Sequence, residues 1–102
     1  MAAYKIVILE NAVKELEDAC KYYNDKVIGL GFELENEVFT VFELIHDNPN
    51  IFPIKFAHIH EAVVSRFPFI ITYEVIGKQI IVLSIFHTKQ NPNKKTKRKL
   101  KK

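Results

Sequence analysis

The sequence is short of the residues that cross-link or anchor a small protein. Its 102 residues include one cysteine, Cys20, so no disulfide can form within the chain, which is typical of a reducing compartment. The apolar run at residues 6–9 ends at Glu10 and is too short for a secretory signal. No apolar run approaches the ~20 residues that a membrane span needs. These absences predict a cytoplasmic protein that does not enter a membrane.

Motifs for phosphate, metal and nucleophile chemistry are absent as well. The three glycines form neither a phosphate-binding loop nor a nucleophile elbow. His58 and His60 stand two residues apart with no cysteine or acidic cluster beside them, which is not a zinc pattern. Cys20 falls on the apolar face of a predicted helix, where cysteine acts as a small core residue. We therefore expect no cofactor and no metal.

What the chain does have is apolar content and an uneven distribution of charge. Apolar residues make up 48% of the sequence, which is enough for one packed domain. Residues 1–50 hold four lysines and ten acidic residues, whereas residues 51–102 hold eleven basic and two acidic residues. Seven of those basic residues fall within 94–102. We predict one domain at residues 1–93 and a basic tail at 94–102, which we expect to be disordered and either to aid solubility or to contact an acidic partner.

The first half of the chain has the pattern of one strand followed by two helices. Residues 4–9 are rich in β-branched side chains, which predicts a strand. Apolar residues then recur at helical spacing and predict helices over about residues 11–28 and 32–47. The glycines within residues 29–31 allow a tight reversal, and the Asn-Pro pair at 48–49 ends the second helix. This part of the chain should form an antiparallel helical hairpin.

The second half changes to the pattern of strands. Residues 50–58 are expected to be a loop. Alternating or continuous apolar residues predict strands at 61–66, 69–75 and 80–86, with a hairpin turn at 76–79. The predicted order is β-α-α-β-β-β. It describes a two-layer α+β domain in which the helical hairpin packs on a mainly antiparallel, four-stranded sheet.

Four side chains are candidates for chemistry near the ends of the last two strands. Arg66 precedes one of these strands and His87 follows its hairpin partner, so both should lie at the same end of the sheet. His87 can exchange a proton near neutral pH, and Arg66 can hold a phosphate through paired hydrogen bonds. Tyr73 and Lys89 can add hydrogen bonds or positive charge, although Tyr73 lies nearer the turn.

Each candidate also has a purely structural interpretation. Arg66 can pair with Glu61 or Glu74 at the sheet surface, and His87 can be a structural or exposed histidine. Tyr73 shares a strand face with apolar residues, which favours core packing. Lys89 can simply be solvated.

The end of the chain resembles one known protein family. Residues 66–69 read Arg-Phe-Pro-Phe, Tyr73 follows on the same strand, and residues 87–92 read His-Thr-Lys-Gln-Asn-Pro. These motifs and the order of predicted elements, over residues 4–93, resemble toxins of the RelE/ParE superfamily from bacterial type II toxin–antitoxin systems. The resemblance implies a growth-inhibiting toxin that a cognate antitoxin neutralises, with an oligomeric state set by the antitoxin complex.

The resemblance leaves two targets open. RelE-like toxins cut mRNA on the ribosome through attack of the ribose 2′-hydroxyl, in which case His87 would be the general acid or base and Arg66 would stabilise the phosphate, with Lys89 and Tyr73 in support. ParE-like toxins poison DNA gyrase and need no such residues. Residues 1–93 carry eight basic and twelve acidic residues, a balance that favours gyrase, whereas His87 favours RNA cleavage.

A function outside toxicity is also open. The chain can be a non-toxic binding module of the same fold that acts with its antitoxin as a DNA-binding co-repressor, with the lysine-rich tail contacting phosphates without reading sequence. The basic second half of the sequence predicts that the antitoxin segment which binds it is acidic.

Overall fold

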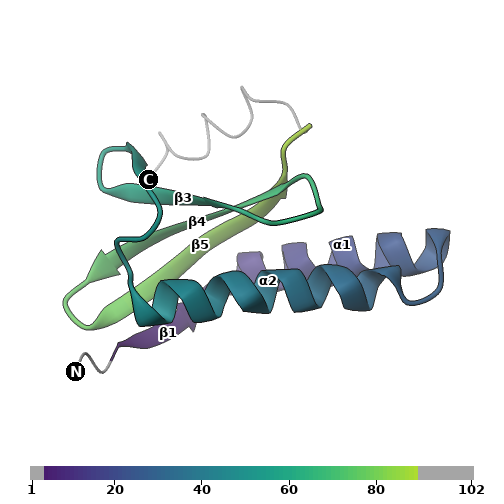
Figure 1. Cartoon of the computed structure of the whole chain (residues 1–102), viewed down its shortest axis with the longest axis horizontal. Coiled ribbons are helices and arrows are strands. Elements are labelled where there is room, and N and C mark those ends of the chain that lie inside the picture. Colours follow the sequence, from purple (N-terminus) through teal and green to yellow (C-terminus); the bar gives the residue numbers. More distant parts are fainter. Residues whose placement is uncertain (1–3, 90–102) are drawn as a thin grey trace.

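The computed structural model describes residues 4–89, and the whole chain is drawn in Figure 1. The predicted tail at 94–102 and the end of the predicted domain lie outside the described residues. The helices and strands follow one another as β1 (Lys5–Ile8), α1 (Glu10–Lys26), α2 (Leu30–Asp47), β2 (Ile54–Phe56), β3 (Ile59–Val63), β4 (Phe69–Ile76) and β5 (Gln79–His87).

The strands form one five-stranded sheet in the order β1-β5-β4-β3-β2. Strand β1 runs parallel to β5, and the other neighbouring pairs are antiparallel. The predicted α+β class and the predicted order of helices and long strands are confirmed. The predicted strand count was one too low, because β2 lies in the segment that we expected to be a loop. This strand has three exposed residues, follows Pro53 and pairs irregularly with β3, so its sequence carries almost no periodicity.

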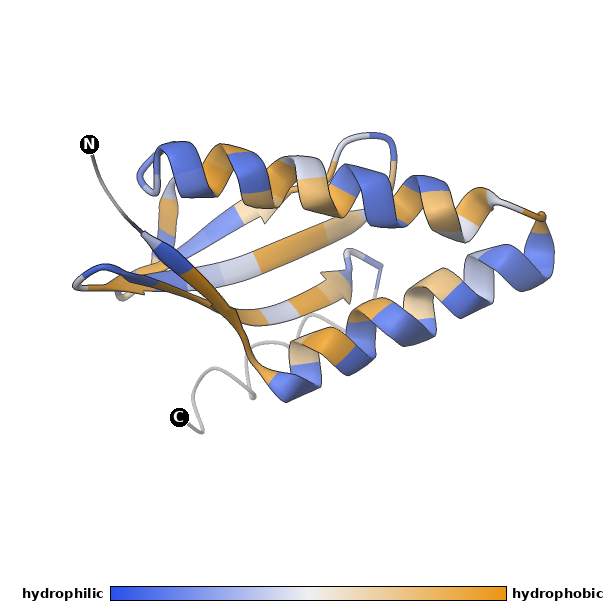
Figure 2. Cartoon of the chain, turned by 90° about the horizontal axis from the view of Figure 1, so that it is seen from below, coloured by the Kyte–Doolittle hydropathy of each residue, from blue (hydrophilic) through white to orange (hydrophobic). Residues whose placement is uncertain are grey.

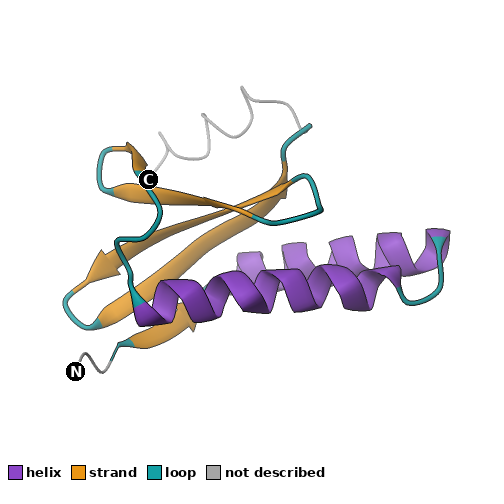
Figure 3. Cartoon of the chain, viewed as in Figure 1, coloured by secondary structure: helices purple, strands orange, loops and turns teal. Residues whose placement is uncertain are grey.

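Helices α1 and α2 lie side by side and cover one face of the sheet, as Figures 1 and 3 show. Their junction is tight, so α2 begins at Leu30, two residues earlier than predicted. Gly29 adopts a left-handed conformation with φ of 89°. At Gly31 an added Cβ would lie 2.2 Å from the carbonyl oxygen of Cys20, so only glycine lets the two helices approach this closely.

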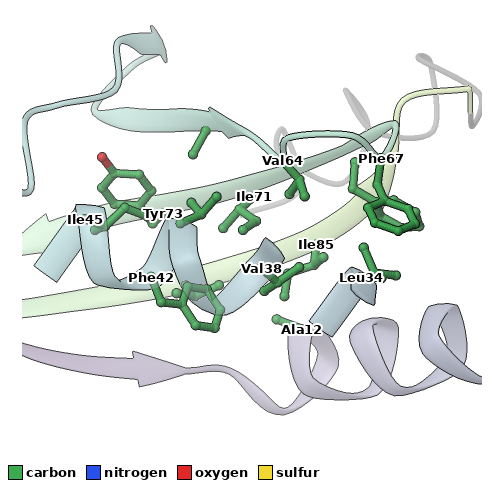
Figure 4. Close-up of a cluster of buried hydrophobic side chains, with 14 of the residues drawn as sticks. Ala12, Leu34, Val38, Phe42, Ile45, Val64, Phe67, Ile71, Tyr73 and Ile85 are labelled. Atoms are coloured by element: carbon green, nitrogen blue, oxygen red, sulfur yellow. The ribbon is translucent and has the colours of Figure 1, made fainter. Parts of the chain in front are cut away.

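The core fills the space between the helices and the sheet. Figure 2 shows apolar and polar residues alternating along both helices, as expected of helices with one buried face. The apolar side chains that meet there are drawn in Figure 4 and include Ala12, Leu34, Val38, Ile45, Val64, Ile71 and Ile85. Burying a side chain such as leucine or isoleucine contributes roughly 1.5–3 kcal/mol, so this layer is the main source of stability. None of the helices within residues 4–89 has the length and apolarity to cross a membrane.

The β4–β5 hairpin fixes the end of the sheet where the candidate residues lie. Its turn contains Gly77 with φ of 59°, and its register pairs Phe69 with His87. Paired residues of antiparallel strands point to the same face, so His87 shares the helix-covered face with Phe69. The hairpin therefore brings the end of β5 next to α1.

Candidate functional site

His87 ends strand β5 and is held by contacts on two sides. Its ring packs edge-to-face on Phe69, with the ring centroids 5.1 Å apart. The backbone N–H of Lys89 donates to His87 Nδ1 at 2.9 Å, so the neutral ring carries its proton on Nε2. The next residue, Thr88, donates its N–H to the carbonyl of Pro68 at 2.7 Å. These bonds fix the end of β5 against the segment that leads into β4, at the end of the sheet where we expected it.

Arg66 lies in the loop before β4, and α2 provides its partners. Its guanidinium donates to Glu33 and, at 3.1 Å, to Glu37, two carboxylates one helical turn apart. The hydrogen bond to Glu33 holds the pKa of Arg66 above its ordinary value. The partners suggested from the sequence, Glu61 on β3 and Glu74 on β4, were wrong. Two carboxylates therefore compensate the charge of Arg66 before any ligand binds.

Tyr73 is a core residue away from this end of the sheet. It is fully buried, its hydroxyl donates to the carbonyl of Pro49 at 2.7 Å, and the ring of His60 stacks on it at 4.6 Å. Burial raises the pKa of Tyr73 to about 12. Four residues of strand, ~13 Å at the usual rise, separate it from Phe69, and Figure 4 shows Tyr73 and Phe67 at opposite ends of the core. Its burial is what the core-packing interpretation predicted, and its hydroxyl also fastens the loop after α2 to the sheet.

The structure thus brings together three of the four predicted residues. The loop with Arg66, the end of β5 with His87, and the exposed Lys89 share one end of the sheet, while Tyr73 does not. Within residues 4–89 no group of histidine, cysteine and acidic side chains could hold a metal ion.

A groove beside His87 was not predicted from the sequence. It has a volume of about 390 Å³ and lies between α1 and the ends of β4 and β5. Its lining residues are Glu15, Asp18, Ala19, Tyr22, Tyr23, Phe69, Ile85, Phe86 and His87. The helical spacing of Glu15, Asp18 and Tyr22 could have shown that they share a face of α1. It could not have shown that this face meets the end of the hairpin.

Comparison with known proteins identifies the family. A family model described as ParE toxin of type II toxin-antitoxin system, parDE, matches residues 6–92. The chain belongs to this ParE toxin family. No curated protein matches its sequence.

Solved structures agree with the assignment at the level of the fold. This ParE-family chain is similar to the chromosomal ParDE toxin–antitoxin system from P. aeruginosa, with a TM-score of 0.75 and 16% identity over 84% of this chain and 97% of that one. It is also similar to the isolated E. coli RelE toxin, with a TM-score of 0.65 and 16% identity over 98% of this chain and all of that one. The predicted resemblance to the RelE/ParE superfamily is therefore confirmed.

The sheet of this ParE-family chain carries little positive charge. Its three central strands, β3, β4 and β5, contain no lysine or arginine. Their acidic residues are Glu61, which pairs in register with Thr72, and Glu74, which pairs with His58. Alternation along β4 places both carboxylates on the face away from the helices, because Tyr73 points into the core. The three central strands therefore offer no lysine or arginine to a phosphate backbone.

Proposed function

We propose that this toxin inhibits growth by acting on DNA gyrase rather than by cutting mRNA, and that a cognate antitoxin neutralises it. The charge layout of the described residues carries the proposal. Arg66 is held by two carboxylates, and the three central strands contain no lysine or arginine.

Cleavage of RNA through the 2′-hydroxyl requires positive charge at the transition-state phosphate. Binding an RNA backbone also depends on lysine and arginine contacts with phosphates. Arg66 would have to leave Glu33 and Glu37 to make such a contact. Tyr73 is buried and cannot reach a substrate at the end of the sheet. These placements support a target that is bound as a protein surface.

A ribonuclease is the second candidate, and the geometry of His87 favours it. Nε2 of the neutral ring carries a proton that could pass to a leaving oxygen, and Lys89 lies two residues away. Under this alternative, His87→Ala lowers ribosome-dependent mRNA cleavage by about 10²–10⁴-fold. Arg66→Ala acts at least as strongly, because it removes the charge that offsets the phosphate.

Induced expression in bacteria tests the proposal in cells. Expression of the chain alone should stop growth, and co-expression of the protein encoded by the adjacent reading frame should restore it. Plasmid DNA from the arrested cells should have lost negative supercoils or been cut, because gyrase introduces negative supercoils by cutting both strands and rejoining them, and a poisoned enzyme leaves the cut open. Normal growth at verified soluble expression would contradict the toxin assignment and favour the binding-module alternative. Arrest with intact, supercoiled plasmid and cut mRNA would favour the ribonuclease.

A further inference from the structure

We propose that the groove between α1 and the end of the β4–β5 hairpin is the docking site for a basic, partly apolar segment of the cognate antitoxin. We call it the α1 groove, with the lining residues given above. The proposal rests on membership of the ParE toxin family, which implies an antitoxin, and does not depend on which target the toxin attacks.

Aromatic rings form a continuous wall of the α1 groove. Tyr22 packs edge-to-face on Tyr23 at 5.4 Å, Tyr23 packs on Phe69 at 6.2 Å, and Phe69 packs on His87 at 5.1 Å. Contacts between rings at these distances hold one another in place. The volume of about 390 Å³ lies within the range of natural binding pockets, roughly 300–1,000 Å³, and accommodates one or two side chains of a partner.

Two carboxylates give the α1 groove its charge. Glu15 and Asp18 stand one turn apart on α1, so they face the same side. Glu15 accepts the backbone N–H of Ile85 at 2.9 Å, which fixes its carboxylate beside β5. Asp18 is exposed and makes no ion pair within the described part of the chain. An apolar groove with two carboxylates is complementary to an apolar side chain flanked by arginine or lysine.

Tyr22 adds a second attraction for cations at the rim. Its side chain is 57% exposed, so a partner can reach the ring. The ammonium of Lys26 already lies 5.1 Å from the centre of this ring, which shows that the ring accepts a cation in the folded chain. A partner arginine could stack on Tyr22 and pair with Asp18 at the same time.

The charge of this partner segment is opposite to the one that the sequence halves suggested. Seven of the basic residues behind that expectation fall within 94–102, outside the described residues. The surface around α1 is acidic instead, because α1 itself holds Glu10, Glu15, Glu17, Asp18 and Asp25 against three lysines. An acidic antitoxin segment would be repelled there.

Binding of short peptides to the isotope-labelled full-length chain tests the chemistry. The probe is a blocked tripeptide of arginine, leucine and arginine, and its counterpart replaces both arginines with glutamate. The basic peptide should shift the amide signals of α1 residues 15–23 and of His87, and the acidic one should not. Asp18→Asn should lower the affinity for the basic peptide by about two- to fivefold, which is the contribution of an exposed ion pair. Tyr22→Ala should lower the same affinity by a similar factor. Glu17→Gln removes the same charge from α1 outside the groove and should change the affinity by less than either.

The antitoxin encoded by the adjacent reading frame tests the occupant. Its affinity should fall by about two- to fivefold in Asp18→Asn and stay near the original value in Glu17→Gln. The proposal would be overturned if the basic peptide shifted signals of other residues, if both peptides bound equally, or if Asp18→Asn left the antitoxin affinity unchanged. Groove signals that move with protein concentration alone would identify a second copy as the occupant. Signals that move with salt alone would identify residues 94–102, and either result would also overturn it.

Discussion

Tyr73 and Arg66 show which properties of single residues a sequence can predict. The alternation along residues 69–75 predicted that Tyr73 points into the core, because strand periodicity depends on local geometry alone. The partners of Arg66 were not predictable in the same way. Glu33 and Glu37 lie about thirty residues earlier, and their approach depends on how α2 sits across the sheet.

At this scale, Tyr73→Phe tests the buried hydroxyl. The substitution removes the hydrogen bond to the carbonyl of Pro49 and should lower the free energy of unfolding by about 1 kcal/mol. Chemical denaturation at neutral pH measures it. Tyr22→Phe, at an exposed ring, is the control and should change stability by less than half as much.

The raised pKa of Tyr73 also predicts how stability depends on pH. The group binds its proton more tightly in the folded chain, because burial raises its pKa to about 12. Its contribution to stability is therefore complete below the unfolded value of about 10 and is lost as pH rises from there through 12. Denaturation midpoints between pH 9 and 12 should fall more steeply in the original chain than in Tyr73→Phe. Parallel curves for the two proteins would contradict the assignment.

At the scale of elements, the junction of α1 and α2 depends on two glycines for different reasons. Gly31 is required by contact, since an added Cβ would meet the backbone of Cys20 at 2.2 Å. Gly29 is required by conformation only, because nothing lies within 4 Å of its added Cβ but its φ is 89°. The sequence predicted a glycine turn here without distinguishing the two roles.

Substituting each glycine by alanine separates these roles. Gly29→Ala should cost about 1 kcal/mol of unfolding free energy, the usual penalty for a left-handed residue with a side chain. Gly31→Ala should lower the unfolding free energy by about 1–3 kcal/mol or more, as in overpacked cores, because the helices must move apart. Thermal and chemical denaturation of both variants checks the order. A smaller loss for Gly31→Ala would mean that the helices do not pack this closely.

The two β-hairpins offer a pair of changes with opposite signs. Ala57, in the β2–β3 turn, has φ of 52°, and Gly77, in the β4–β5 turn, has φ of 59°. Ala57→Gly should raise the unfolding free energy by up to about 0.5 kcal/mol, since relief of the left-handed strain exceeds the added chain entropy. Gly77→Ala should lower it by about the same amount or more. If denaturation experiments show that both substitutions change the unfolding free energy in the same direction, one of the two turns does not have a left-handed residue at this position.

At the scale of the whole molecule, the arrangement of layers was predictable and the arrangement of charge was not. Helical and strand periodicities, with glycine and proline at the boundaries, were sufficient for the α+β class. The sequence placed negative charge in the first half and positive charge in the second. Folding redistributes it, because α2 brings Glu33 and Glu37 to Arg66 and α1 brings Glu15 and Asp18 to the end of β5.

We propose that this ParE-family chain inhibits gyrase and does not cut RNA. The most direct measurement adds the purified chain to DNA gyrase in a supercoiling assay and, in parallel, to ribosomes translating a defined mRNA. If gyrase is the target, supercoiling activity should fall with increasing toxin and recover when the antitoxin is added, and the mRNA should stay intact. Cleavage of the mRNA that requires His87, with unaffected supercoiling, would contradict it.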